Sequence, residues 1–157
     1  MIEKQPKTSV IVRAVRRNSE TGELEHLVCR RLRQPYFGKV GRITGKVRFG
    51  ETFEEAAARE LVEETGLEAG KLTLEEIYRK MRKREDGVFV QDVIFYIFFA
   101  SELQGELIKK TDTQENLWGT KESILKNCDI YDDLVLDDLA DPKKLKFTCS
   151  VDFADGF

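Results

Sequence analysis

Cysteine and histidine are scarce in this sequence of 157 residues, which contains three cysteines and a single histidine, His26. The cysteines (Cys29, Cys128 and Cys149) form no C-x-x-C pair, so we expect no zinc site built from cysteine and histidine. A secreted domain of this size would more often have paired cysteines, so we expect a reduced, cytoplasmic protein. We interpret Cys29 as a small buried apolar side chain rather than a nucleophile.

Long apolar segments and an excess of positive charge are also missing. The longest apolar run, residues 93–100, has eight residues, whereas a membrane span needs about 20. Residues 1–7 contain no apolar stretch, so we expect no signal peptide. Lys plus Arg is 26 and Asp plus Glu is 29, giving a net charge of −3, which argues against a protein that coats nucleic acid. We therefore expect no membrane or nucleic-acid partner.

Hydrophobic residues make up 41% of the sequence, enough for one core, and the length is typical of one domain. The Asp86-Gly87 turn predicts a hairpin, and we expect its nearly all-apolar second strand to be buried on both faces. Strand and helix patterns alternate, so the expected class is mixed α and β (α/β or α+β), with helices packed on a mixed sheet. The expected strands are residues 8–15, 24–32, 72–84, 88–100 and 144–153, and the expected helices are residues 53–65, 120–126 and 131–140.

The helix predicted over residues 53–65 has capping residues at both ends. Thr52 and Glu55 form a T-x-x-E capping box at its start, and Gly66 stands where a helix-ending glycine belongs. These end signals define the helix more sharply than its periodicity does.

Three glutamates of this helix, Glu60, Glu63 and Glu64, stand at i, i+3 and i+4 and so share one face. Ala56 and Ala57 lie on the same face, which we therefore expect to be acidic and open. Like charges at this spacing destabilise a helix, but convergent carboxylates suit a hard divalent ion, Mg²⁺ or Mn²⁺. A glutamate-rich face is also common on ordinary solvated helices, so the three residues alone leave both interpretations open.

The glycine-rich loop before the helix adds groups that suit a phosphate ligand. Gly45 could offer a carbonyl oxygen to a metal, and Lys46 and Arg48 could meet phosphate charge. Glu51 adds a fourth acid just before the cap. Together these residues predict hydrolysis of a phosphate anhydride, in which metal neutralises the phosphates and a carboxylate accepts a proton from water.

Residues 45–67 resemble the signature of the Nudix hydrolase family, which reads glycine, five residues, glutamate, seven residues, then R-E-aliphatic-x-E-E-x-G-aliphatic. Here Gly45 and Glu51 are followed by Arg59-Glu60-Leu61-Val62-Glu63-Glu64-Thr65-Gly66-Leu67, so every specified position matches. The order of the expected elements also fits this family. The resemblance implies a Nudix-type α/β/α sandwich with a mixed sheet over residues 1–157.

The resemblance also implies roles for individual residues. The glutamates of the signature bind the divalent ions and supply or support the catalytic base; the matching residues are Glu60, Glu63 and Glu64. The carbonyl matching Gly45 is a further metal ligand, and the arginine matching Arg59 orients the carboxylates, including Glu51. The family often uses another acid after the last long strand, for which Glu115 is our candidate and Asp112 its competitor.

The C-terminal third of the chain resembles the end of the 8-oxo-dGTP diphosphatase-like members of the family. In those members an aspartate pair meets the purine edge, and Asp132 and Asp133 match it here. The same two residues are equally well explained as acids at the start of a helix. Residues 40–44 lack the asparagine that this subgroup uses to contact the base, and Lys39 and Arg42 could meet a phosphate or a sugar instead.

We therefore expect a Nudix pyrophosphohydrolase that depends on Mg²⁺ or Mn²⁺ and acts on a small-molecule nucleotide, as a monomer or a homodimer. The preferred substrate is a (deoxy)nucleoside triphosphate, including 8-oxo-purine forms, cleaved to the monophosphate and pyrophosphate. One alternative is an ADP-ribose or nucleotide-sugar pyrophosphatase, and another is a non-catalytic nucleotide-sensing module. Four aromatic residues are candidates to stack on a base: Phe37, Tyr78, Phe89 and Trp118. Aromatic side chains in such a fold more often belong to the hydrophobic core.

Overall fold

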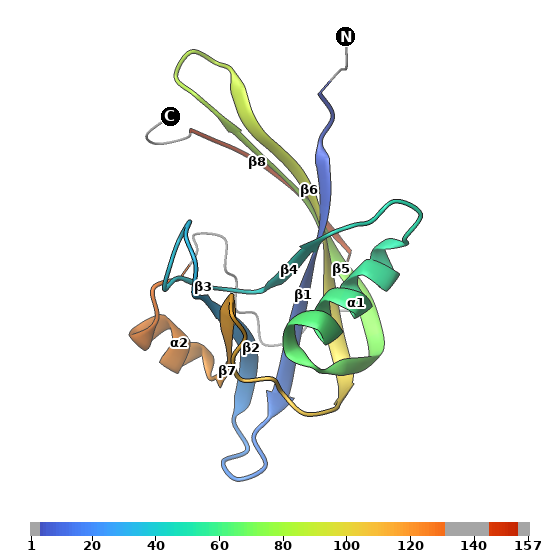
Figure 1. The fold of residues 1–157 in the computed structure, drawn as a ribbon, viewed down its shortest axis with the longest axis vertical. Coiled ribbons are helices and arrows are strands. Elements are labelled where there is room, and N and C mark those ends of the chain that lie inside the picture. Colours follow the sequence, from blue (N-terminus) through green and yellow to red (C-terminus); the bar gives the residue numbers. More distant parts are fainter. Residues whose placement is uncertain (1–3, 131–144, 154–157) are drawn as a thin grey trace.

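The computed structural model describes residues 4–130 and 145–153, which form an eight-stranded sheet and two helices (Figure 1). The helices are α1 (Phe53–Thr65) and α2 (Lys121–Asn127). The strands are β1 (Lys7–Arg17), β2 (Leu24–Arg31), β3 (Val40–Gly41), β4 (Ile43–Lys46), β5 (Glu68–Lys83), β6 (Phe89–Gln104), β7 (Gln114–Gly119) and β8 (Lys146–Phe153).

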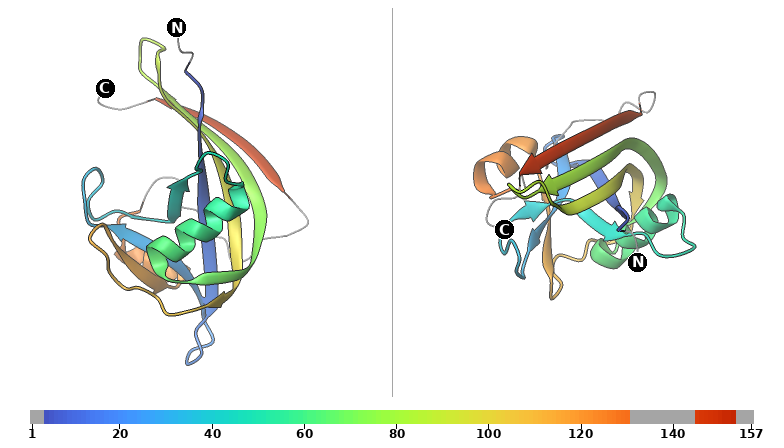
Figure 2. Two further views of the ribbon diagram at one scale, coloured as in Figure 1. Left: turned by 45° about the vertical axis from the view of Figure 1, so that its right-hand side comes forward. Right: turned by 90° about the horizontal axis from the view of Figure 1, so that it is seen from above.

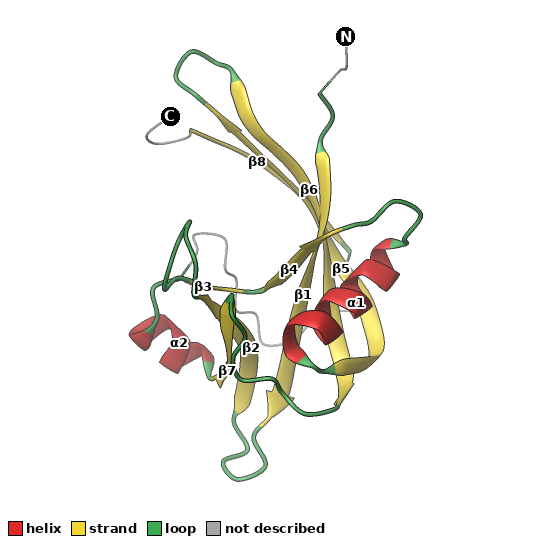
Figure 3. Cartoon of the chain, viewed as in Figure 1, coloured by secondary structure: helices red, strands yellow, loops and turns green. Residues whose placement is uncertain are grey.

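The sheet is mixed, as the sequence predicted. Its order is β3-β2-β1-β6-β5-β8, with β4 paired to β1 and β7 paired to β2. Strand β1 runs parallel to β6 and β5 runs parallel to β8, whereas the other strand pairs are antiparallel. Helix α1 packs against β1, β4 and β5, and α2 packs against β2 on another side of the molecule (Figure 3). The expected mixed α and β class is confirmed.

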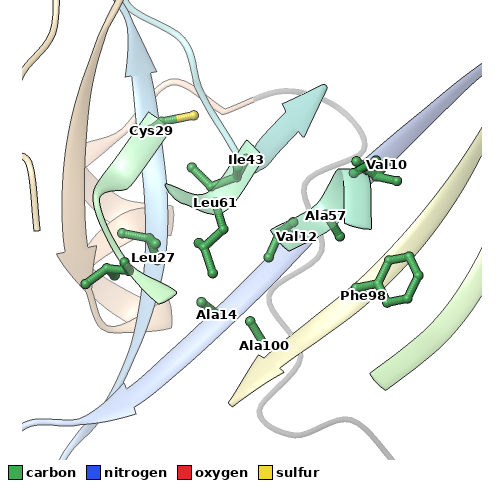
Figure 4. Close-up of a cluster of buried hydrophobic side chains, with 12 residues drawn as sticks. Val10, Val12, Ala14, Leu27, Cys29, Ile43, Ala57, Leu61, Phe98 and Ala100 are labelled. Atoms are coloured by element: carbon green, nitrogen blue, oxygen red, sulfur yellow. The ribbon is translucent and has the colours of Figure 1, made fainter. Parts of the chain in front are cut away.

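Strand β1 lies in the middle of the sheet, and both of its faces are covered. Val10, Val12 and Ala14 belong to the main hydrophobic core beneath α1 (Figure 4). On the opposite face Arg13 is 5% exposed and pairs with Glu75 through two hydrogen bonds of 2.8 and 2.9 Å. Alternation along the strand therefore directs Val10 and Val12 to the helix and a neutralised charge to the other face.

The predicted hairpin at Asp86-Gly87 is confirmed, with β5 and β6 antiparallel around it. The expected burial of the whole second strand is wrong, because Val88, Phe89 and Val90 are exposed. This end of the hairpin extends beyond the body of the molecule, with β8 alongside it (Figure 2). The chain becomes buried only from Val93 onward, where β6 enters the core.

Most other expected elements are present with shifted ends. The helix at residues 53–65 has the predicted bounds, that at 120–126 is observed as α2, and the last strand is observed as β8. The helix expected at residues 131–140 lies outside the described residues. No helix in the described part of the chain is long and apolar enough to cross a membrane.

Candidate functional site

Helix α1, which carries the three glutamates, is capped at both ends by local interactions. The Thr52 hydroxyl oxygen accepts a hydrogen bond from the Glu55 N–H (3.1 Å), and the Glu55 carboxylate accepts one from the Thr52 N–H (3.0 Å). Gly66 adopts a φ of 75° and donates its N–H to the Val62 carbonyl (2.9 Å). The caps fix where the helix begins and ends, and therefore which of its residues face the sheet.

The acidic face of α1 is not open, contrary to the sequence-based expectation. Ala56 and Ala57 are fully buried and belong to the core. Alanine has a short side chain, so the sheet can approach the helix closely at these positions. Glu60 and Glu64 are consequently half-buried, whereas Glu63 is exposed.

Arg59 is the cation at the centre of the carboxylates. Its guanidinium donates to Glu51 (2.6 and 3.0 Å), Glu60 (2.7 Å) and Glu63 (3.3 Å), and also to the Lys46 carbonyl (2.9 Å). Hydrogen bonding from Arg59 is the main reason why the pKa of Glu51 is lowered to about 2, and the pKa of Arg59 is raised in turn. One guanidinium thus holds three carboxylates and the preceding loop in a fixed arrangement.

Gly45 lies on β4 directly against the side chain of Glu60. A Cβ atom on Gly45 would overlap the Glu60 carboxylate, so only glycine leaves room for that side chain in this position. Two residues that the sequence predicted as metal ligands, one through its carbonyl and one through its carboxylate, are therefore neighbours in the fold.

Glu64 is the most strongly perturbed of the three glutamates. Burial is the main reason why its pKa is raised to about 8, the charge of Glu60 adds to the shift, and a hydrogen bond from Gln114 opposes it. Glu64 also lines a cavity of about 940 Å³, near the upper end of the range of about 300–1,000 Å³ for small-molecule sites. A carboxylate that titrates near neutral pH beside such a cavity is typical of a catalytic acid or base.

Two residues of β7 that the sequence analysis missed hold Glu64 in place. The Asn116 amide donates to the backbone carbonyls of Glu64 (2.8 Å) and Ile108 (2.7 Å), and its side-chain oxygen accepts from Gln114 (2.7 Å). Asn116 is buried, so these bonds fix the Gln114 amide next to the Glu64 carboxylate. The sequence here offers only a run of three polar residues, Gln114, Glu115 and Asn116, which does not say which face of the strand meets the helix.

The structure does not bring the predicted fifth acid to the carboxylates. Glu115 lies opposite Arg30 of β2 and pairs with it at 3.5 Å, on the other face of β7 from Asn116. Asp112, its competitor, is exposed in the turn before β7. The side chain of β7 that reaches Glu64 is an amide, that of Gln114, and not an acid.

The two basic candidates near the helix make different contacts with the cluster. Arg48 Nη2 lies 3.5 Å from a Glu63 oxygen, and Lys46 contributes its backbone carbonyl to Arg59. Asp132 and Asp133, the candidates for base recognition, lie outside the described residues.

The aromatic candidates are dispersed over the molecule. Tyr78 lines the cavity and stacks with Phe95 at a ring-centroid distance of 6.2 Å. Phe37 and Phe89 are exposed, and Arg16 lies over the ring of Trp118. The cavity also contains Cys29, where burial raises the pKa of the thiol to about 12, as expected of an unreactive apolar side chain.

The donor set at α1 fits a hard divalent cation. The three glutamates offer only oxygen, and together with Glu51 they outnumber the two guanidinium groups, of Arg59 and Arg48, that lie against them, so the cluster holds more negative than positive charge. Burial is the main cause of the raised pKa of Glu64, and the charges of Glu60 and Glu63 add to it. Within the described residues no three acidic, thiol or imidazole side chains already converge as a metal site, because Glu60 and Glu63 are turned toward Arg59.

Comparisons with known proteins place this geometry in context. The family model of the NUDIX domain matches residues 7–136. No curated protein matches the chain. Among solved structures, the MutT protein from Bacillus halodurans is 23% identical, with a TM-score of 0.64, over 76% of this chain and 72% of that one. A MutT NUDIX hydrolase from Burkholderia pseudomallei is 23% identical, with a TM-score of 0.62, over 84% and 92%.

A third structural neighbour was solved with a ligand. The NUDIX domain of Shewanella oneidensis NrtR, complexed with ADP ribose, is 15% identical with a TM-score of 0.61, covering 79% of each chain. At these identities the structural likeness concerns the fold.

Proposed function

The chain belongs to the NUDIX domain family as a pyrophosphohydrolase, and on that premise we propose that it cleaves a diphosphate bridge in a nucleotide bound in the cavity beside Glu64. The observation that carries this proposal is the position of Glu64. It belongs to the carboxylate cluster of α1, touches the ligand cavity and has a pKa raised to about 8. A single side chain thus joins the site for charge stabilisation to the site for the substrate.

The residues of the cluster have different roles in the proposed reaction. Gly45, Glu60, Glu63 and Glu64 would hold Mg²⁺ or Mn²⁺, which when bound neutralises phosphate charge and lowers the pKa of water. Glu64 or Glu60 accepts the proton of the attacking water. Arg59 keeps the carboxylates in place through its four hydrogen-bonded partners.

The proposed substrate is a (deoxy)nucleoside triphosphate, including oxidised purine forms, cleaved to the monophosphate and pyrophosphate. Three cations from one segment, Arg31, Arg33 and Lys39, line the cavity. A triphosphate brings more negative charge to them than the diphosphate of ADP-ribose or of a nucleotide sugar does, and this supports the triphosphate. Recognition of the base by Asp132 and Asp133 is part of the proposal, as are a cytoplasmic location and a monomeric or homodimeric state.

A substrate screen tests this function. Purified protein with Mg²⁺ is incubated with common and 8-oxo-purine nucleoside triphosphates, ADP-ribose, nucleotide sugars and dinucleoside polyphosphates, and the products are separated by chromatography. Release of pyrophosphate from a triphosphate is the expected result. Products formed only from ADP-ribose or sugar nucleotides would keep the chemistry but overturn the substrate class. No turnover of any compound would favour a nucleotide-sensing module.

Variants of α1 test whether the cluster performs the reaction. We expect the double substitution Glu63→Gln, Glu64→Gln to lower the rate by at least about 10²-fold, because the charge stabilisation of the phosphates is lost. Glu54→Gln is the matched control, since Glu54 is an exposed glutamate in the first turn of the same helix. Undiminished turnover by the double variant would contradict the assignment of the site.

A further inference from the structure

The cavity extends away from α1 onto the inner face of the hairpin that projects from the molecule. Tyr78, Lys80 and Arg82 alternate along β5, so they share one face, and all three line the cavity. The neighbouring strands add polar side chains to the same wall: Gln91 of β6, and Ser150 and Asp152 of β8. Figure 2 shows these three strands side by side along the projecting arm.

The far end of this wall is well separated from the carboxylates. Gly45 contacts Glu60 near the carboxylates. Across the sheet Gly45 pairs with Val10 of β1, Val10 pairs with Tyr96 of β6, and Tyr96 pairs with Ile77 of β5. Arg82 stands five residues further along β5, roughly 17 Å at the usual rise of about 3.3 Å per strand residue. A triphosphate chain seated at Glu60 and Glu64 is too short to reach Arg82.

The charge of the cavity is opposite to that of the chain. Among its described lining residues the carboxylates are Glu64 and Asp152, whereas the cations are Arg31, Arg33, Lys39, Arg42, Lys80 and Arg82. The whole chain has a net charge of −3, so the cations are gathered here. Asp152 is paired with Arg82 in the strand register, yet in the described part of the chain no carboxylate forms an ion pair with Arg82.

We propose that the cavity holds a second anion site at Arg82, and that the preferred substrate carries a phosphate group remote from the bridge that is cleaved. This inference rests on the proposed cleavage of a diphosphate bridge and adds a second anionic group to the substrate. The remote phosphate has two chemical sources, a phosphorylated sugar on a nucleoside triphosphate or the phosphorylated second half of a dinucleotide. The stacked pair of Tyr78 and Phe95 lies between the two ends of the cavity and offers an aromatic surface to a base.

Matched ligand pairs that differ only by the remote phosphate test the proposal. One pair is GTP and guanosine 3′-monophosphate 5′-triphosphate, and the other is NAD⁺ and NADP⁺. Dissociation constants are measured by calorimetry on the whole chain without divalent metal, so that binding is read without turnover. We expect the extra phosphate to tighten binding by about tenfold in at least one pair, as a charge-assisted contact to arginine would.

The substitution Arg82→Gln should remove most of that preference, while the affinity for the ligand without the remote phosphate changes little. Arg79→Gln is the matched control, because Arg79 lies on the same strand but on the outer face, paired with Asp92 at 2.7 Å. Equal affinities within both pairs, or equal losses in the two variants, would overturn the proposal.

Hydrolysis assays on the same preparations separate this inference from the proposed function. Cleavage of triphosphates without any preference for a remote phosphate would reject the second anion site and keep the hydrolase. Preference in binding without cleavage of any ligand would support the second anion site and reject the proposed hydrolase. If the preference appears only for the guanosine pair or only for the dinucleotide pair, the source of the phosphate is identified.

Discussion

Replacing Gly45 by alanine separates the activity of this protein from its stability. The added Cβ would occupy the space of the Glu60 carboxylate. That carboxylate is the end of a flexible side chain, so it can rotate away without moving the backbone. The substitution therefore displaces one proposed metal ligand while leaving the core, which lies beneath Ala56 and Ala57, unchanged.

The size of the two effects follows from the contacts of Glu60. Rotation breaks its hydrogen bond to Arg59 (2.7 Å), and a hydrogen bond to a charged group contributes about 1.5–3 kcal/mol. Relief of the repulsion between Glu60 and Glu64 offsets part of this loss. We expect a cost of at most about 2 kcal/mol, a fall in Tm of about 4–8 °C at most for a domain of this size. Loss of a preorganised charged group should lower kcat by about 10²-fold or more.

The assay combines initial rates of pyrophosphate release with thermal unfolding of Gly45→Ala, Glu60→Ala and the double variant. If Gly45→Ala acts only by displacing Glu60, it should have no further effect on kcat once Glu60 is alanine. A Gly45→Ala protein that keeps its rate within about threefold would refute the reasoning, and so would additive losses in the double variant.

Three further predictions concern single groups. In metal-free protein the folded state holds a proton on Glu64 up to about pH 8, whereas its ordinary pKa is 4.5; urea unfolding should show stability falling as pH rises between these values, and Glu64→Gln should flatten that slope. Iodoacetamide at pH 8 should modify the exposed Cys149 in folded protein and the buried Cys29 only after unfolding, as read by peptide mass spectrometry. Thr52→Ala should cost about 1 kcal/mol in chemical denaturation, through loss of the cap of α1; an unchanged midpoint would show that the cap contributes nothing.

The ends of α1 and the Asp86-Gly87 hairpin could be predicted because their determinants are local. Thr52 and Glu55 contact each other within one helical turn, and Gly66 ends the helix through its own backbone conformation. Signals of this kind are complete within a few residues, so the sequence alone contains them.

The burial of the acidic face could not be predicted, because periodicity places residues on a common face without saying what that face meets. Ala56 and Ala57 share the face of the glutamates and are suited to open surface as well as to close packing. Packing against the sheet decides that the alanines are buried, because β1 and β4 pack against α1 and cover them.

The face of β7 on which Glu115 lies depends on the exact register between β7 and β2. Pairing of β7 with β2 sets Glu115 opposite Arg30 and Asn116 opposite Cys29. A shift of one residue would exchange the two faces, and the partner strand is about 85 residues earlier in the chain. No local pattern contains that information, which is why Gln114 and Asn116 were missed.

The parallel pairing of β1 with β6 has a consequence for how the chain reaches its fold. Lys7 pairs with Val93 in this register, a separation of 93 − 7 = 86 residues, and α1 lies inside the loop that this contact closes. The β1–β2 and β5–β6 hairpins join strands that are neighbours in the chain and can form early. The pairing of β1 with β6 at the centre of the sheet requires closure of the long loop between them, which is entropically costly. We therefore expect folding in the millisecond-to-second range of non-local topologies.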